Sequence, residues 1–163
     1  MTKLILSIAM ATALIASSAW AADKAGEKFI KEAMEGNLAE VQVGKLAQEK
    51  GQSQDVKSFG QMLVTDHGQA NQKATSVAGS MGVTPPSEPN KKQKAVYDKL
   101  SKLSADKFDR AFAREMVKDH KKDIRAFEKE AKRKNSAAAA FANETLPTLK
   151  KHLDMAQSLA KAK

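Results

Sequence analysis

The chain has 163 residues, a formal net charge of +9, and 42% hydrophobic residues, of which few are aromatic. This length suits a single domain with its own core, and the absence of cysteine excludes disulfides and thiolate metal ligands. With one Trp and one Tyr, the basic residues are not interleaved with aromatic ones, so we expect no binding of nucleic acid.

The first 21 residues show the order of features that is typical of a secretory signal peptide. Lys3 supplies a positive charge, residues 4–16 are mostly apolar, and residues 19–21 read Ala-Trp-Ala, a small-residue cleavage site. The apolar run is shorter than the ~20 residues of a membrane-spanning helix, although an uncleaved anchor is the alternative. We therefore expect residues 22–163 to form one periplasmic domain without a transmembrane segment.

The rest of the chain predicts helices and no strands, because Ala, Lys, Glu, Gln, Leu and Met dominate it. Gly and Asn residues end the helical stretches, and Ser and Asn residues cap the following ones. Three prolines exclude a helix over residues 83–89. These signals place four main helices at about 24–50, 53–81, 105–134 and 136–161, and a short helix at about 91–102.

The lengths of the connections indicate the topology. Tight turns join the first two and the last two main helices, so each pair packs antiparallel. The connection between the second and third main helices exceeds 20 residues, which is long enough to run the length of the molecule. We therefore predict an all-α fold, a ferritin-like four-helix bundle with a long crossover between helices two and three that carries the short extra helix. A helical hairpin pair that dimerises is the alternative.

An internal repeat supports the equivalence of the second and third main helices. Residues 59–67 and 112–120 share the pattern Phe-small-x-x-(Leu/Met)-Val-x-Asp-His at an offset of 53 residues. Amphipathic helices share apolar positions by chance more readily than they share an Asp-His pair in the same register. The repeat therefore draws attention to the histidines.

The three histidines of the chain each lie on a stripe of apolar residues at helical spacing. His67, His120 and His152 lie near the middle of their helices, so their rings fall at similar depth in the core, at ~1.5 Å per residue. Glu40 is the carboxylate on the corresponding stripe of the first helix. Three imidazoles and one carboxylate suit a divalent transition metal such as Zn, Cu, Fe or Mn. The acids that could hydrogen-bond these ligands are Asp66, Glu115, Asp119 and Asp123.

Two alternatives to a metal site remain open. The histidines could form a buried polar layer without metal, in which His67 bonds Glu40 or a buried carbonyl and His120 pairs with His152 or a water. The chain could also be an envelope interaction protein, because residues 91–134 contain 16 basic and 8 acidic residues that could dock on an anionic surface; a solvated helix face explains the same charge. No Ser-His-Asp ordering, phosphate loop or dinucleotide fingerprint occurs, so we expect a binding role rather than an enzymatic one.

Several motifs resemble a bacterial exported family that is catalogued as domain of unknown function 4142. They are Gly36-Asn37-x-x-Glu40, Val56-Lys57-x-Phe59-x-x-Met62-x-x-x-Asp66-His67, Val117-x-Asp119-His120 and Leu146-Pro147-x-Leu149-x-x-His152. The resemblance spans nearly all of the mature chain, and it implies a ferritin-like bundle in the cell envelope, often labelled an outer-membrane protein. It implies no activity.

The resemblance does not extend to carboxylate-bridged di-iron chemistry. Such bundles use Glu-x-x-His on two helices, whereas here Val64, Val117 and Leu149 stand three residues before the histidines. We therefore do not expect a di-iron oxidase site.

Overall fold

The computed structural model describes residues 12–134 and 136–162, with side chains from residue 24 onward. Every regular element in this part of the chain is a helix, which confirms the all-α prediction. The elements are α1 (Thr12–Lys50), α2 (Gln54–Ser80), α3 (Lys91–Ser101), α4 (Ala105–Ala131) and α5 (Ala137–Lys161). None of these helices combines the length and the apolar content that a membrane crossing requires.

The helices begin and end close to the predicted residues, with one larger difference at the start. Ser53 caps α2 by accepting the Val56 N–H at 3.1 Å, and Asn90 forms a capping box with Gln93 at the start of α3. However, α1 begins at Thr12 rather than near residue 24, because residues 12–23 contain no Gly or Pro that would end a helix. The first 11 residues of the predicted signal peptide lie outside the described residues.

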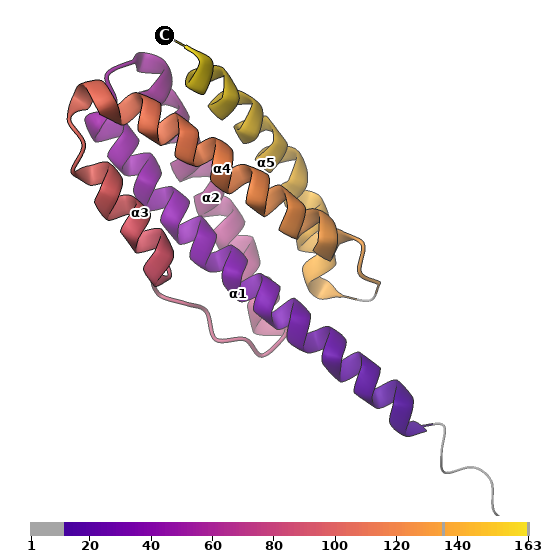
Figure 1. Ribbon diagram of the computed structural model, residues 1–163. Helices are drawn as coiled ribbons and strands as arrows, with labels where there is room; N and C mark the ends of the chain where they lie inside the picture. The colour runs from indigo at the N-terminus through magenta and orange to yellow at the C-terminus, as the bar shows by residue number, and fades with distance from the viewer. Residues whose placement is uncertain (1–11, 135, 163) are drawn as a thin grey trace, which may run out of the picture.

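The chain folds into two antiparallel helix pairs that pack against each other (Figure 1). α1 packs along α2, and α4 packs along α5, while α2 contacts α5 and α1 contacts α4. Figure 1 shows that α3 returns the chain along the outside of α1, so α2 and α4 run in the same direction. This arrangement brings the middles of α2, α4 and α5 together.

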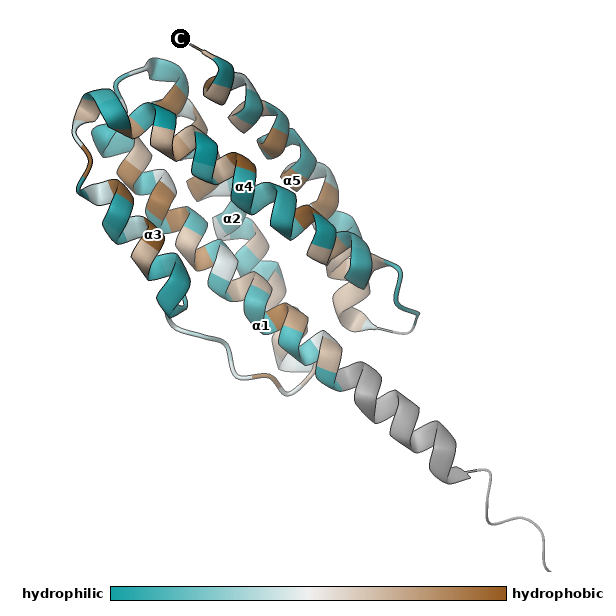
Figure 2. Cartoon of the chain, viewed as in Figure 1, coloured by the Kyte–Doolittle hydropathy of each residue, from teal (hydrophilic) through white to brown (hydrophobic). Residues whose placement is uncertain are grey.

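Hydrophobic and hydrophilic residues alternate along the helices (Figure 2). The apolar core has two clusters, and a layer of buried polar residues lies between them along the helices. Phe59, Phe108 and Phe112 belong to one cluster, and Phe127 and Phe141 belong to the other. The buried polar residues of this layer are Asn37, Glu40, His67, His120 and His152. Burying polar side chains costs free energy unless they find partners, so the stability of this layer depends on what these five side chains bind.

Gly44 on α1 and Gly60 on α2 allow these two helices to approach each other closely beside the polar layer. A Cβ atom added to Gly60 would lie 2.6 Å from the carbonyl oxygen of Gly44, and one added to Gly44 would lie 2.7 Å from the carbonyl oxygen of Gly60. Only residues without a side chain permit this contact. The close approach lets a short side chain on α1 reach His67 on α2.

Candidate metal centre

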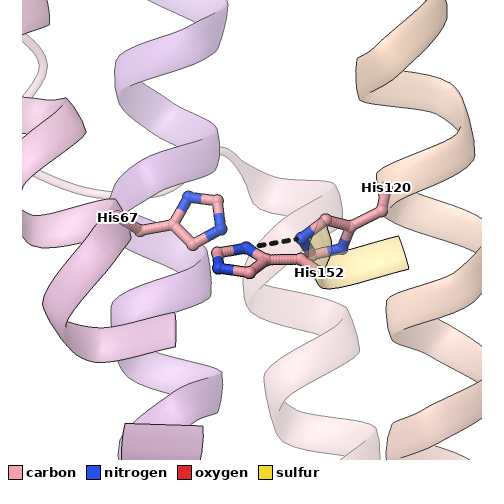
Figure 3. Close-up of side chains that lie close together, drawn as sticks. All are labelled: His67, His120 and His152. Atoms are coloured by element: carbon pink, nitrogen blue, oxygen red, sulfur yellow. Dashed lines mark hydrogen bonds between the residues drawn. The ribbon is translucent and has the colours of Figure 1, made fainter. Parts of the chain in front are cut away.

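Three imidazole rings from three helices meet in the polar layer (Figure 3). His67 on α2, His120 on α4 and His152 on α5 are exposed by only 4%, 1% and 0%. Their ring centroids lie 5.3–5.7 Å apart, and one nitrogen of each ring lies within 4.8 Å of the others. The sequence placed these three residues at similar depth, and the structure brings them into one cluster.

An acceptor on α1 fixes the protonated nitrogen of His67. Its Nδ1 lies 2.9 Å from Oδ1 of Asn37, which can only accept a hydrogen bond. Nδ1 therefore carries the proton, and Nε2 of the neutral ring presents a lone pair. This Nε2 is buried, and no described residue offers it a hydrogen bond.

Acceptors fix the other two rings in the same way. His120 Nδ1 lies 3.0 Å from the backbone oxygen of Met116, one turn earlier on α4, so it donates and leaves the lone pair on Nε2. His152 Nε2 lies 2.9 Å from Oδ2 of Asp66, so it donates to the carboxylate and leaves the lone pair on Nδ1. Each of the three rings thus has one nitrogen held by an acceptor and one nitrogen free to bind an electrophile, as in metal-ligating histidines.

The closest contact in the cluster joins two of these lone-pair nitrogens. His120 Nε2 and His152 Nδ1 lie 3.3 Å apart, along the dashed line of Figure 3. Because the other nitrogen of each ring already holds its proton, two neutral rings have no proton to place between them. Either an additional proton or a metal ion is needed to make this contact attractive.

Burial makes the additional proton unfavourable near neutral pH. It lowers the pKa of His120 to about 4, with the neighbouring His152 adding to the effect. It also lowers the pKa of His67 far below the ordinary value, again with help from the other two rings. The pKa of His152 is lowered by burial, although Asp66 opposes the shift. The three rings are therefore neutral at pH 7 and ready to act as ligands.

The spacing suits a tetrahedral metal ion. Two nitrogens bound to such an ion at ~2.0–2.1 Å lie roughly 3.3 Å apart, which is the distance between His120 Nε2 and His152 Nδ1. One nitrogen of His67 lies within 4.8 Å of a nitrogen of each of the other two rings, so a small shift of the ring would bring it into the set. Three nitrogen ligands leave a fourth position for water or another ligand.

Glu40 lies beside this cluster but on the other side of His120. Its Oε1 is 4.0 Å from His120 Nδ1, the nitrogen that donates to Met116, rather than from the lone-pair nitrogen. Burial and the negative charges of Asp119 and Asp123 raise the pKa of Glu40 well above its ordinary value. The structure therefore brings Glu40 close to the candidate ligands without directing it toward the space between the rings.

The other predicted acids divide between two places. Asp66 accepts the hydrogen bond from His152. Glu115, Asp119 and Asp123 lie instead in a pocket beside Glu40, where burial and the charge of Asp119 raise the pKa of Asp123 to about 6.

Two hydrogen-bonding partners of the rings were not among the predicted site residues. Asn37 occurs on the apolar stripe of the first helix and three residues before Glu40, and a lone polar residue there is a usable signal. The backbone oxygen of Met116 leaves no signal in the sequence.

The fold and this centre define a class: an all-helical protein with three histidines from three helices in a buried cluster. The family model described as "Domain of unknown function (DUF4142)" matches residues 11–159, and the chain belongs to this family. This confirms the resemblance in the sequence motifs. No curated protein and no solved structure matches the chain.

Proposed function

We propose that this protein is an exported, periplasmic ferritin-like four-helix bundle that binds one transition-metal ion through His67, His120 and His152. Its role would be metal storage, buffering or protection from metal stress. The observation that carries the proposal is the contact between His120 Nε2 and His152 Nδ1, where two lone pairs face each other at 3.3 Å. A divalent ion such as Zn, Cu, Fe or Mn would turn this contact into a favourable one.

The surroundings of the three rings support this assignment over a plain polar layer. In a polar layer that needs no ion, each buried nitrogen finds a partner, yet His67 Nε2 has none in the part of the chain that the structure describes. The acceptors Asn37 and Asp66 hold two rings in the tautomers that a metal requires. Residues 1–21 support the export part of the proposal.

Metal retention by purified protein tests the proposal. The chain is stripped with a chelator, dialysed against Zn²⁺, Cu²⁺, Fe²⁺ or Mn²⁺, and analysed for bound metal. We expect one equivalent of at least one metal, and an increase of about 2.7 kcal/mol in the free energy of unfolding at a hundredfold excess over Kd. His67→Ala and His152→Ala should lose this metal, whereas Lys121→Ala, at an exposed position on α4, should retain it.

Two results would overturn the proposal. One is substoichiometric retention of all four metals together with an unchanged melting temperature. The other is retention of a full equivalent by both histidine variants, which would place the metal elsewhere.

A second candidate function is docking on an anionic envelope surface. The observation that favours it is a stripe of exposed basic side chains along α4, on the face away from the buried histidine. The stripe comprises Arg110, Arg114, Lys118, Lys121, Lys122, Arg125 and Lys129. Their spacing of three and four residues keeps them on one side of the helix, and lipid phosphates attract such a stripe.

Vesicle binding tests this second function. Sedimentation with vesicles that contain anionic phospholipid should show binding at low salt that falls steeply as salt is added. Absence of binding at low salt would exclude the docking function and leave the metal proposal untouched.

A further inference from the structure

Three carboxylates stand one above another on α4. Glu115, Asp119 and Asp123 are spaced four residues apart, so they lie on successive turns of one face. Like charges at this spacing destabilise a helix by roughly 0.2–0.5 kcal/mol per pair. A positive charge close to these carboxylates would therefore stabilise the helix.

This face of α4 is turned toward α1 across a pocket of about 490 Å³ that residues of α1, α3 and α4 line. Glu40 on α1 lines the pocket. Gly36 lies one turn earlier on α1, and a Cβ atom added to it would lie 3.9 Å from Oδ2 of Asp123, so the two helices are close here. The lining includes six acidic and three basic residues. In a protein with a net charge of +9, an acidic pocket at this place is a local reversal of charge.

The lysines at the edge of the pocket pair with its outer carboxylates and do not reach its buried end. Lys118 Nζ pairs with Glu115 at 2.9 Å, and Lys122 Nζ lies 3.6 Å from Asp119 and 3.5 Å from Asp123. Their side chains are 75% and 66% exposed, so they approach from the solvent side. Such exposed pairs contribute little.

The inner end of the pocket holds an unpartnered carboxylate oxygen. Glu40 is only 3% exposed and lies within hydrogen-bonding reach of Asp119. Two ionised carboxylates have no proton to share, so Glu40 Oε2 then has no hydrogen-bond partner among the described residues. A buried carboxylate oxygen without a partner is costly. Oxygen ligands from several carboxylates are what Mg²⁺, Ca²⁺ and Mn²⁺ prefer in proteins.

We propose that this pocket is a second cation site, in which Glu40, Asp119 and Asp123 bind a hard divalent cation between α1 and α4. The site is distinct from the space between the three rings, because no histidine lines the pocket, and Glu40 borders both, with its Oε1 4.0 Å from His120 Nδ1. The cation would neutralise the carboxylates that face each other across the two helices and would hold α1 against α4. Water would complete its coordination from the open side, as Mg²⁺ and Ca²⁺ commonly require.

Calorimetric titration of the chelator-stripped full chain with Ca²⁺ and with Mg²⁺ tests this site, because neither ion favours imidazole. We expect one ion per chain, with a Kd of about 1 mM or lower. Asp123→Asn and Glu40→Gln should each weaken binding at least about tenfold, since each removes a charged ligand. Glu49→Gln, which removes one exposed carboxylate outside the pocket, should leave the Kd unchanged.

The histidine centre is separated from this test by a double variant. His67→Ala/His152→Ala should bind Ca²⁺ or Mg²⁺ as the unmodified chain does, so that failure of one proposal leaves the other standing. Circular dichroism shows whether each variant keeps its helices. Asp123, whose side chain is 22% exposed, is a safer position for substitution than Glu40, which is 3% exposed. Binding of neither ion to the unmodified chain, or equal binding by Asp123→Asn and Glu49→Gln, would overturn the second site.

Discussion

Lowering the pH from 7.5 to 5.5 should weaken Zn²⁺ binding by the histidine centre far less than it would weaken binding by three exposed histidines. A metal competes with protons for the ring nitrogens, and three solvent-exposed rings with pKa 6.5 would lose about tenfold in affinity each, or about 10³ together. In this structure, burial lowers the pKa of His120 to about 4 and lowers those of His67 and His152 as well. His120 is therefore already neutral at pH 5.5, and the lowered pKa values of His67 and His152 reduce their share of the loss, so the expected total loss is well below 10³-fold.

Competition with a chelator of known affinity at each pH measures this effect. The unfolded histidines have pKa values near 6.5, so their contribution to stability is present above that pH and is lost as pH falls toward the folded pKa of about 4 for His120. Asp123 has the opposite effect on the free energy of unfolding. Its pKa of about 6 is higher in the folded state, so protonation of Asp123 stabilises the fold as the pH falls. Circular dichroism at both pH values is the control that the chain remains folded. A 10³-fold loss in a folded chain would refute the buried, neutral cluster.

Three further changes test other parts of the structure. Asp66→Asn should weaken Zn²⁺ binding roughly 10–100-fold, because it removes the charge that holds His152; Asp98→Asn, at an exposed position on α3, should not, and equal affinities would contradict the role of Asp66. Nitrogen NMR of the metal-free chain at pH 7 should show two Nδ1–H tautomers and one Nε2–H tautomer, and imidazolium signals would contradict the assignment. Gly60→Ala should cost about 1–3 kcal/mol by overpacking, measured by urea unfolding; Gly68→Ala, with open space around it, should stabilise by roughly 0.5–1 kcal/mol, and equal effects would mean that α1 and α2 do not touch there.

The sequence predicts the helices and the meeting of the histidines because both follow from periodicity. An apolar stripe with one histidine determines which face of the helix is buried, and the lengths of the turns determine the depth of the residue. Ser53 and Asn90 cap their helices as expected. The start of α1 is the exception. Residues 12–23 have high helix propensity and extend the helix, although the sequence predicts a cleaved signal peptide that ends before residue 22.

The details of the site are not predictable from periodicity. Glu40 occupies the right stripe and depth, yet its direction depends on how α1 sits against α4, and it points to the far nitrogen of His120. The partner of His67 proves to be Asn37 instead. Tautomers depend on individual acceptors, one of them a backbone oxygen of Met116, which no side-chain pattern reports.

The location of a bound metal tests the central claim most directly. Crystals grown with one equivalent of Zn²⁺ should give a single anomalous peak at the zinc edge, about 2.0–2.1 Å from His67 Nε2, His120 Nε2 and His152 Nδ1. A peak at any other group of side chains, or no peak in crystals of the folded chain, would contradict the account.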